Sequence, residues 1–253
     1  IHRSVWTAFL LLATTFLFSK WNILKKILND KKKLFILFIS GFLIFVNWGV
    51  WIYAVSVDKI IDASFGYFIM PIISVFLGNF FFNEPITKKG KISIFLVIIS
   101  VSYLLIIDFN SIPWVGLIVA LSWSFYNLFR KKINVETDIG LLIESLYILP
   151  FVLVAFYFIS INNYNDFSLS NPSLMPLLML AGPMTVIPLF LYVRGVELAG
   201  LGPAGMIFYI TPTLQFILGF FIYNEEFNIN QLVSFILIWI AVFIYLKDIY
   251  EKN

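Results

Sequence analysis

Two stretches of the chain, FIMPIISVFLGNFFFNE at residues 68–84 and YITPTLQFILGFFIYNE at residues 209–225, align without a gap at a separation of 141 residues. A chain rich in Phe and Leu produces Phe and Leu matches by chance, but it explains shared Pro, Gly, Asn and Glu poorly. The sequence therefore contains an internal repeat. The matched pairs are Pro71 with Pro212, Leu77 with Leu218, Gly78 with Gly219, Phe80 with Phe221, Asn83 with Asn224 and Glu84 with Glu225.

The composition of the whole chain indicates that lipid, rather than water, surrounds most of the protein. Of 253 residues, 61% are hydrophobic and 12% are charged, whereas soluble domains average about 45–50% and about 25%. The apolar runs are continuous rather than alternating, which excludes a transmembrane β-barrel, because backbone polar groups in lipid are satisfied only within a helix or a closed barrel. We expect an all-α integral membrane protein.

Nine apolar runs have about the length that a helix needs to cross a bilayer. The repeat copies lie in the third and the eighth of them, and five crossings between copies turn the second upside down. We therefore predict two inverted repeats, at 1–107 and 112–247, a symmetry typical of secondary transporters. The predicted spans are 4–19, 34–57, 64–82, 92–107, 112–129, 139–160, 173–196, 204–223 and 231–247.

Basic residues set the expected orientation. All of the 17 Lys and Arg residues except Arg3 and Lys59 fall on one side of the predicted bundle, which the positive-inside rule makes cytoplasmic. The C-terminus is then cytoplasmic and Ile1 lies outside, at the edge of a span. We expect an earlier span, so that the complete protein has ten helices in two five-helix repeats and 1–107 lacks its first helix. The segment KWNILKKILNDKKK (20–33) is interpreted as a charged loop that fixes topology, with a basic helix on anionic lipid as the alternative.

Several motifs resemble one transporter family over residues 2 to about 246. They are HRSVW (2–6), NWGVWIYAVSVDKIIDASFGYFIMPIISVFLGNFFFNE (47–84), FYNLFRKKINVETDIGLLIESLYILP (125–150) and FYITPTLQFILGFFIYNE (208–225). Together they resemble the RarD branch of the EamA transporters, in the drug/metabolite transporter superfamily. The resemblance implies ten helices in two inverted five-helix halves with both termini cytoplasmic, and it leaves the substrate undefined.

Polar, aromatic and helix-breaking residues inside the predicted spans are candidates for a substrate cavity. A mid-membrane polar group needs a partner, which is either a ligand or another helix, and aromatic residues also serve as interfacial anchors. The prolines interrupt helical hydrogen bonding and act as hinges or as fixed kinks. These candidates are Asn47, Trp48, Tyr67, Pro71, Tyr126, Tyr209, Pro212 and Gln215.

Charged residues near the spans give three further candidates. Glu144 is the one carboxylate within a predicted span, and we interpret it as a proton- or cation-binding group, with an ion pair to the nearby basic loop as the alternative. His2 and Arg3 belong to the family-like motif and also suit interfacial anchoring. Glu84 and Glu225 are interpreted as structural partners of backbone amides or basic loops.

These residues favour a permease that moves a small metabolite or an amphipathic compound by alternating access in a plasma or bacterial inner membrane. A channel or lipid scramblase is the alternative. A membrane enzyme is disfavoured, because one His and no Cys leave no His-rich or thiolate metal site and no His-based protease triad. We expect no catalytic residues, metal or cofactor and no nucleic acid. The expected partners are membrane lipid and the transported molecule, with proton or sodium coupling and a homodimer left open.

Overall fold

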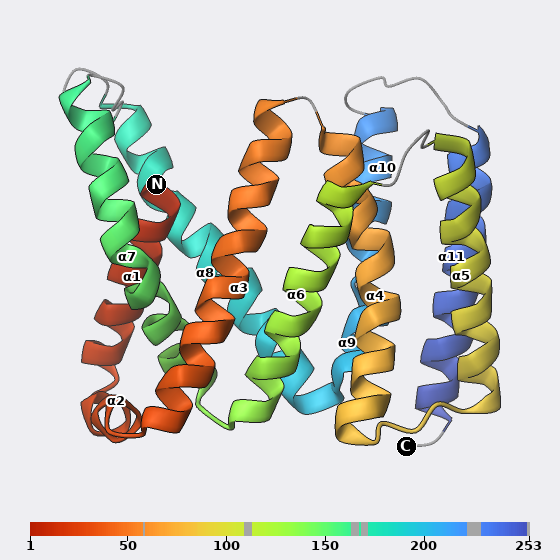
Figure 1. Cartoon of the computed structure of the whole chain (residues 1–253), viewed down its shortest axis with the longest axis horizontal. Coiled ribbons are helices and arrows are strands. Elements are labelled where there is room, and N and C mark those ends of the chain that lie inside the picture. Colours follow the sequence, from red (N-terminus) through yellow and green to blue (C-terminus); the bar gives the residue numbers. More distant parts are fainter. Residues whose placement is uncertain (58, 109–112, 163–166, 168–171, 222–228, 252–253) are drawn as a thin grey trace. The chain divides into compact units, whose positions relative to one another are not determined.

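The computed structural model describes residues 1–57, 59–108, 113–162, 167, 172–221 and 229–251, with the side chains of 60–62, 108, 215, 216, 218–221 and 231 left out. All regular secondary structure in this part of the chain is helical (Figure 1). The helices are α1 (His2–Leu17), α2 (Trp21–Leu28), α3 (Lys31–Ser56), α4 (Ile60–Phe82), α5 (Lys88–Asp108), α6 (Trp114–Ile133), α7 (Thr137–Ile161), α8 (Leu174–Ala199), α9 (Leu201–Ile207), α10 (Ile210–Phe221) and α11 (Ile229–Tyr250).

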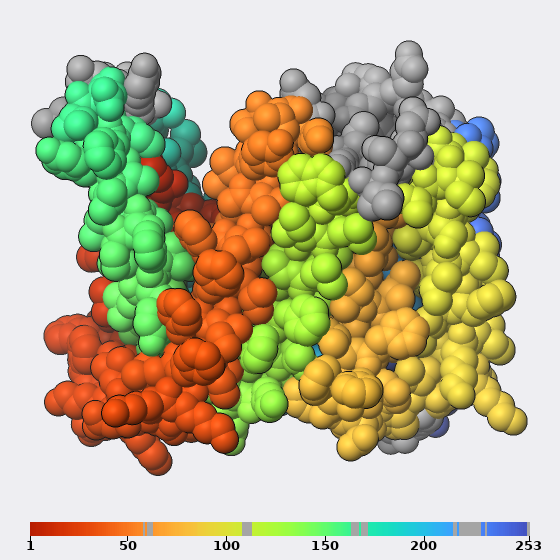
Figure 2. Space-filling view, viewed as in Figure 1, coloured from red at the N-terminus to blue at the C-terminus, as the bar shows by residue number. Residues whose placement is uncertain are grey.

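Six of the described helices are long and apolar enough to cross a membrane, namely α3, α4, α5, α7, α8 and α11. The pair α1 and α2, bent by 117°, makes a seventh if it forms one span. Large apolar side chains are exposed along these helices; Phe35, Phe38, Phe42 and Phe45 of α3, for example, are each at least 42% exposed. Figure 2 shows the segment that contains α3 in orange. Water would oppose such exposure, whereas lipid covers it at no cost.

The chain forms two compact units, which are described separately. Unit 1 comprises 1–45 and 129–197, and its main helix pair is α1 against α7. Its core is aliphatic and joins α2 and α3 to α7, with Leu24, Leu37, Ile139 and Leu142 each at most 5% exposed. Gly182 of α8 lies against the backbone of Trp6 in α1, an approach that small residues permit between membrane helices.

Unit 2 comprises 46–128 and 198–253, and its main helix pairs are α5 with α11 and α4 with α9. Three hydrogen bonds among the described residues join α5 to α11: Ser93 Oγ donates to the Ala241 carbonyl at 2.5 Å, Ser100 Oγ donates to the Ser234 carbonyl at 2.8 Å, and Tyr103 Oη donates to Asn230 Oδ1 at 2.9 Å. A later residue of α5 thus meets an earlier residue of α11, so the two helices are antiparallel.

The interpretation of 20–33 as a loop is wrong for its central part, because Trp21–Leu28 is a helix. Leu24 and Ile27 are each 5% exposed and pack in the core of unit 1. Burial of these two side chains on one face stabilises a helix that a hydropathy window across 20–33, with its six lysines, misses.

The predicted span 204–223 is not one continuous helix in the described residues. Helix α9 ends at Ile207 and α10 begins at Ile210, ahead of Pro212. Pro212 therefore occupies the first turn of α10, where its missing N–H costs no helical hydrogen bond. In contrast, α4 continues on both sides of Pro71. Asn224 and Glu225 lie outside the described residues.

Candidate functional site

Asn47 is a buried cross-link between helices of unit 2. Its Nδ2 donates to the Val119 carbonyl and to Ser122 Oγ, both at 3.0 Å, which ties α3 to α6. This is the helix-to-helix alternative for a polar membrane residue. A role of Asn47 in ligand binding stays a prediction.

Aromatic rings from three helices of unit 2 and the α9–α10 connection form a continuous series. The ring of Tyr67 lies 5.4 Å from that of Trp51 and 5.7 Å from that of Phe208, and Trp123 lies 6.0 Å from Phe208 and 5.9 Å from Tyr126. These centroid distances are those of favourable aromatic pairs. We call these five residues the aromatic series. Tyr126 is fully buried within it and Tyr67 is half-buried, whereas Trp48 is a half-buried neighbour on α3.

Tyr209 joins the break between α9 and α10 to the middle of α4. Its hydroxyl donates to the Phe68 carbonyl at 2.8 Å, and Tyr209 is 2% exposed. Pro71, one turn further along α4, is buried, and its ring removes the amide that would bond the Tyr67 carbonyl. The structure thus brings two predicted residues, Tyr209 and Pro71, to one region of unit 2. The side chain of Gln215 lies outside the described residues.

Glu144 lies in unit 1 beside Arg130, at the junction of α6, α7 and α3. Arg130 Nη1 is 3.7 Å from Glu144 Oε1, and Ser40 Oγ of α3 donates to the same oxygen at 2.5 Å. The two charged side chains are 0% and 3% exposed. At 3.7 Å the contact between Arg130 and Glu144 is an ion pair rather than a hydrogen bond. It is the ion pair with the basic loop that is expected from the sequence as the alternative for Glu144. A role of Glu144 in coupling stays a prediction.

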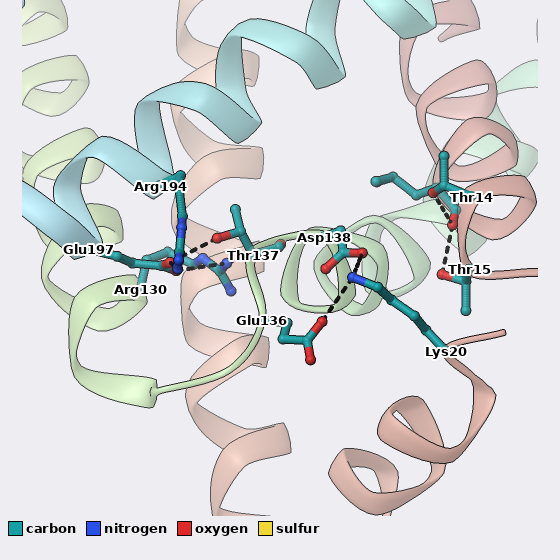
Figure 3. Close-up of polar contacts among 10 residues, drawn as sticks. Thr14, Thr15, Lys20, Arg130, Glu136, Thr137, Asp138, Arg194 and Glu197 are labelled. Carbon is teal, nitrogen blue, oxygen red and sulfur yellow. Dashed lines mark hydrogen bonds and ion pairs between the residues drawn. The ribbon is translucent and has the colours of Figure 1, made fainter. Parts of the chain in front are cut away.

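Arg130 also contacts the end of α8 (Figure 3). Its Nη2 lies 3.7 Å from Glu197 Oε1 and donates to the Thr137 carbonyl at 3.2 Å. Glu197 Oε2 accepts hydrogen bonds from Thr137 Oγ1 at 2.8 Å and from Arg194 Nη1 at 3.1 Å. One buried guanidinium therefore binds two carboxylates on different helices. We call Arg130, Glu144, Glu197, Thr137 and Ser40 the buried charge cluster.

Gly140 of α7 makes room for this guanidinium. A Cβ at that position would overlap the Arg130 guanidinium, with Cζ only 2.7 Å away. Burying a charge without partners costs several kcal/mol, so the cluster requires both its carboxylates and this missing side chain.

Lys20 forms a second, more exposed ionic contact in unit 1. Its Nζ donates to Asp138 Oδ2 at 2.6 Å and to Glu136 Oε2 at 2.8 Å, which ties the α1–α2 turn to the start of α7 (Figure 3). Burial acts to lower the pKa of Lys20, but the hydrogen bonds and charges of Asp138 and Glu136 outweigh it and raise that pKa above its usual 10.5.

His2 packs on aromatic rings of unit 1, with its ring centroid 5.4 Å from that of Phe156 and 5.5 Å from that of Phe167. Arg3 is exposed. The contact between His2 and Phe156 joins α1 to α7.

Glu84 caps a helix in unit 2. Its carboxylate accepts the amides of Leu201 and Gly202, both at 2.9 Å, and Gly200 before them has φ +103°, a conformation suited to glycine. This confirms the interpretation of Glu84 as a partner of backbone amides. Beside it lies an open pocket of about 180 Å³ lined by Glu84, Tyr245 and apolar residues. The described residues contain no group of three His, Asp or Glu side chains that could hold a metal ion.

Long apolar helices with exposed apolar faces, and charges confined to helix ends and one buried cluster, define a multi-pass helical membrane protein. The model of the EamA-like transporter family matches residues 2–106 and 111–247, and the chain belongs to this family.

Three relatives illustrate the similarity. Protein RarD of Salmonella typhi is 34% identical over 247 residues, covering 98% of this chain and 84% of that protein. An uncharacterized transporter of Vibrio cholerae is 32% identical, with 98% and 82% covered. The chloramphenicol-sensitive protein RarD of Pseudomonas aeruginosa is 26% identical, with 95% and 81% covered.

Sequence reasoning missed most of the buried charge cluster. The basic loop is expected from the sequence as an alternative partner of Glu144, but nothing there singles out Arg130, which precedes two further lysines and differs from them in its exposure of 0%. Glu197 lies one residue past a predicted span, and its spacing of three from Arg194 was the available signal of an ionic contact on one helix face. No sequence signal marks Ser40.

Proposed function

We propose that the protein is a permease that carries a small metabolite or an amphipathic, drug-like compound across a plasma or bacterial inner membrane by alternating access. The observation that carries the proposal is the antiparallel pairing of sequence-equivalent helices. Two inverted copies of one structure can exchange inward-open and outward-open shapes around a shared site.

The repeat offset relates helix bounds as well as residues. Adding 141 to the bounds of α5, Lys88–Asp108, gives 229–249, and α11 is Ile229–Tyr250. Adding it to α4, Ile60–Phe82, gives 201–223, and α9 with α10 covers 201–221. The family model also matches in two parts, 2–106 and 111–247. These coincidences support repeats at 1–107 and 112–247.

Two of the hydrogen bonds between α5 and α11 support the inversion. The offset pairs Ser93 with Ser234 and Ser100 with Ala241. Exchanging each residue for its equivalent therefore converts the Ser93–Ala241 contact into the Ser100–Ser234 contact. Such reciprocity is expected of two antiparallel copies about a two-fold axis. Each compact unit contains helices of both repeats, so one repeat is not the rigid body of the movement.

The proposed cargo contacts are those of the aromatic series with Asn47. Aromatic faces and a few hydrogen-bonding groups suit an amphipathic molecule, and one relative is named for chloramphenicol sensitivity. Glu144 is the proposed coupling residue. A Glu144→Gln variant should lose the pH dependence of transport, whereas full uptake with an unchanged pH profile would remove Glu144 from the mechanism.

Orientation is testable because the chain contains no cysteine, so any introduced thiol is unique. We propose a cytoplasmic C-terminus, with Lys26 on the cytoplasmic side and Lys59 outside. A membrane-impermeant maleimide should label Lys59→Cys in intact cells and Lys26→Cys only after permeabilisation. The reverse pattern would invert the proposed topology.

The function is tested by uptake into proteoliposomes of a panel that includes chloramphenicol and small metabolites, with and without a proton gradient. Saturable uptake competed by an unlabelled panel member supports a carrier. Uptake that rises linearly with concentration favours a channel, and exchange of labelled phospholipid between leaflets favours a scramblase.

A further inference from the structure

Helix α2 is held crosswise at the end of α1. The chain bends by 117° between α1 and α2. If α1 crosses the bilayer, α2 therefore lies nearer to parallel with the membrane surface than to parallel with α1. Leu24 and Ile27 fix α2 in place by burial in the core of unit 1, where they join Ile139 and Leu142 of α7. The position of α2 is therefore determined by packing, and its opposite face is presented outward.

The outward side of α2 and the start of α3 carry a group of lysines without acidic partners. In the described residues no carboxylate lies within ion-pair distance of any of them, and Lys20, which binds Glu136 and Asp138, is not part of the group. The nearby Asp30 carboxylate is used as a helix cap, accepting the amides of Lys32 and Lys33 at 3.1 Å. The lysines are Lys25, Lys26, Lys31, Lys32 and Lys33, all exposed except the half-buried Lys33.

These charges are electrostatically unfavourable where they are. Three of them occupy the first turn of α3, where positive charge opposes the helix dipole. Mutual repulsion adds to that cost. An anion at this surface would relieve both effects.

Apolar side chains flank the same lysines. Phe16, Leu17 and Phe18 at the end of α1 are 68%, 73% and 69% exposed, and Trp21 at the start of α2 is 40% exposed. A free anion would leave these side chains in water, whereas a phospholipid supplies acyl chains for them as well as a phosphate for the lysines. In Figure 2 this segment, in red to orange at the lower left, projects outward.

We propose that residues 16–33 form a binding surface for anionic phospholipid, here called the basic platform. The lysines bind headgroup phosphates of the adjacent leaflet, and the apolar residues contact the upper part of the acyl chains. This inference is independent of the proposed transport activity.

The test is native mass spectrometry of the purified protein titrated with phosphatidylglycerol or phosphatidylcholine. The quadruple variant Lys25→Gln, Lys26→Gln, Lys31→Gln, Lys32→Gln should bind phosphatidylglycerol at least about twentyfold more weakly, since a lysine near an anionic surface contributes about fivefold and two of the four acting fully already give about 25-fold. Its binding of phosphatidylcholine should not change. The matched control Lys88→Gln with Lys91→Gln, which removes two exposed lysines elsewhere, should stay within twofold of the wild type.

Two further variants separate charge from folding. Replacing the same four lysines by arginine should retain phosphatidylglycerol binding, and the double variant Lys25→Gln, Lys26→Gln, which leaves α3 unchanged, should weaken it about fivefold or more. The proposal is overturned if the quadruple glutamine variant binds phosphatidylglycerol within twofold of the wild type. Equal wild-type affinity for the two lipids would also overturn it, as would equally effective competition by glycerophosphoglycerol, which has no acyl chains.

Discussion

Replacing Glu144 by Gln should destabilise unit 1 by about 3 kcal/mol. Glu144 and Arg130 are nearly inaccessible, and at 3.7 Å two unit charges attract by about 4–5 kcal/mol at an effective dielectric constant of about 20. Removing one partner of a buried pair typically costs about 3–5 kcal/mol. Arg130 keeps Glu197 at 3.7 Å, and the Gln carbonyl can still accept from Ser40, so the loss falls at the lower end.

The assay is thermal unfolding in detergent followed by tryptophan fluorescence. A loss of about 3 kcal/mol should lower Tm by roughly 6–12 °C for a chain of this size. A double-mutant cycle with Arg130→Met isolates the pair, because each single variant leaves a buried charge and the double variant removes both. We expect a coupling energy of about 2–3 kcal/mol. Additive effects within about 0.5 kcal/mol would refute the reasoning.

Three further predictions use the same unfolding assay. Gly140→Ala should lower the free energy of unfolding by about 1–3 kcal/mol, because the added Cβ meets the Arg130 guanidinium. The control Gly195→Ala, whose added Cβ meets no neighbouring atom within 4 Å, should be neutral or stabilising. Equal effects of the two variants would contradict the close contact at Gly140. Folding raises the pKa of Lys20, so the stability that its ion pairs contribute is fully present below its usual pKa of 10.5 and is lost as the pH rises through the folded-state pKa. Tm should therefore fall in a step above about pH 10.5, and Lys20→Met should remove that step. A step that persists in the variant would assign the titration to another group. Glu84→Gln should cost about 1–2 kcal/mol and speed hydrogen exchange of the first amides of α9, and unchanged exchange would exclude the cap.

The features that follow from local hydropathy and from the internal repeat were the ones predicted best from the sequence. The runs at 92–107 and 231–247 correspond to α5 and α11, because a long apolar run in lipid has no alternative to helix. For 20–33 the sequence favoured a loop, with a helix only as the alternative, because the stability of α2 rests on two buried side chains, Leu24 and Ile27, whose partners lie on α7. Tertiary packing decides such a short helix.

The polar residues of the candidate site were found more readily than their partners. Asn47 and Glu144 are conspicuous because a polar group in an apolar run must be satisfied. Which group satisfies it depends on contacts distant in the sequence, such as Asn47 with Val119 and Glu144 with Ser40. Arg130 resembles its basic neighbours in sequence and differs from them only in burial.

The most direct test of alternating access is counterflow in proteoliposomes. Vesicles are loaded with a saturating unlabelled substrate and diluted into a trace of the same labelled compound. A carrier that exposes one site to each side in turn should accumulate the label transiently above its equilibrium level, and efflux should accelerate when substrate is present outside. A channel or scramblase would bring the label monotonically to equilibrium with no acceleration, and that result would contradict the proposed function.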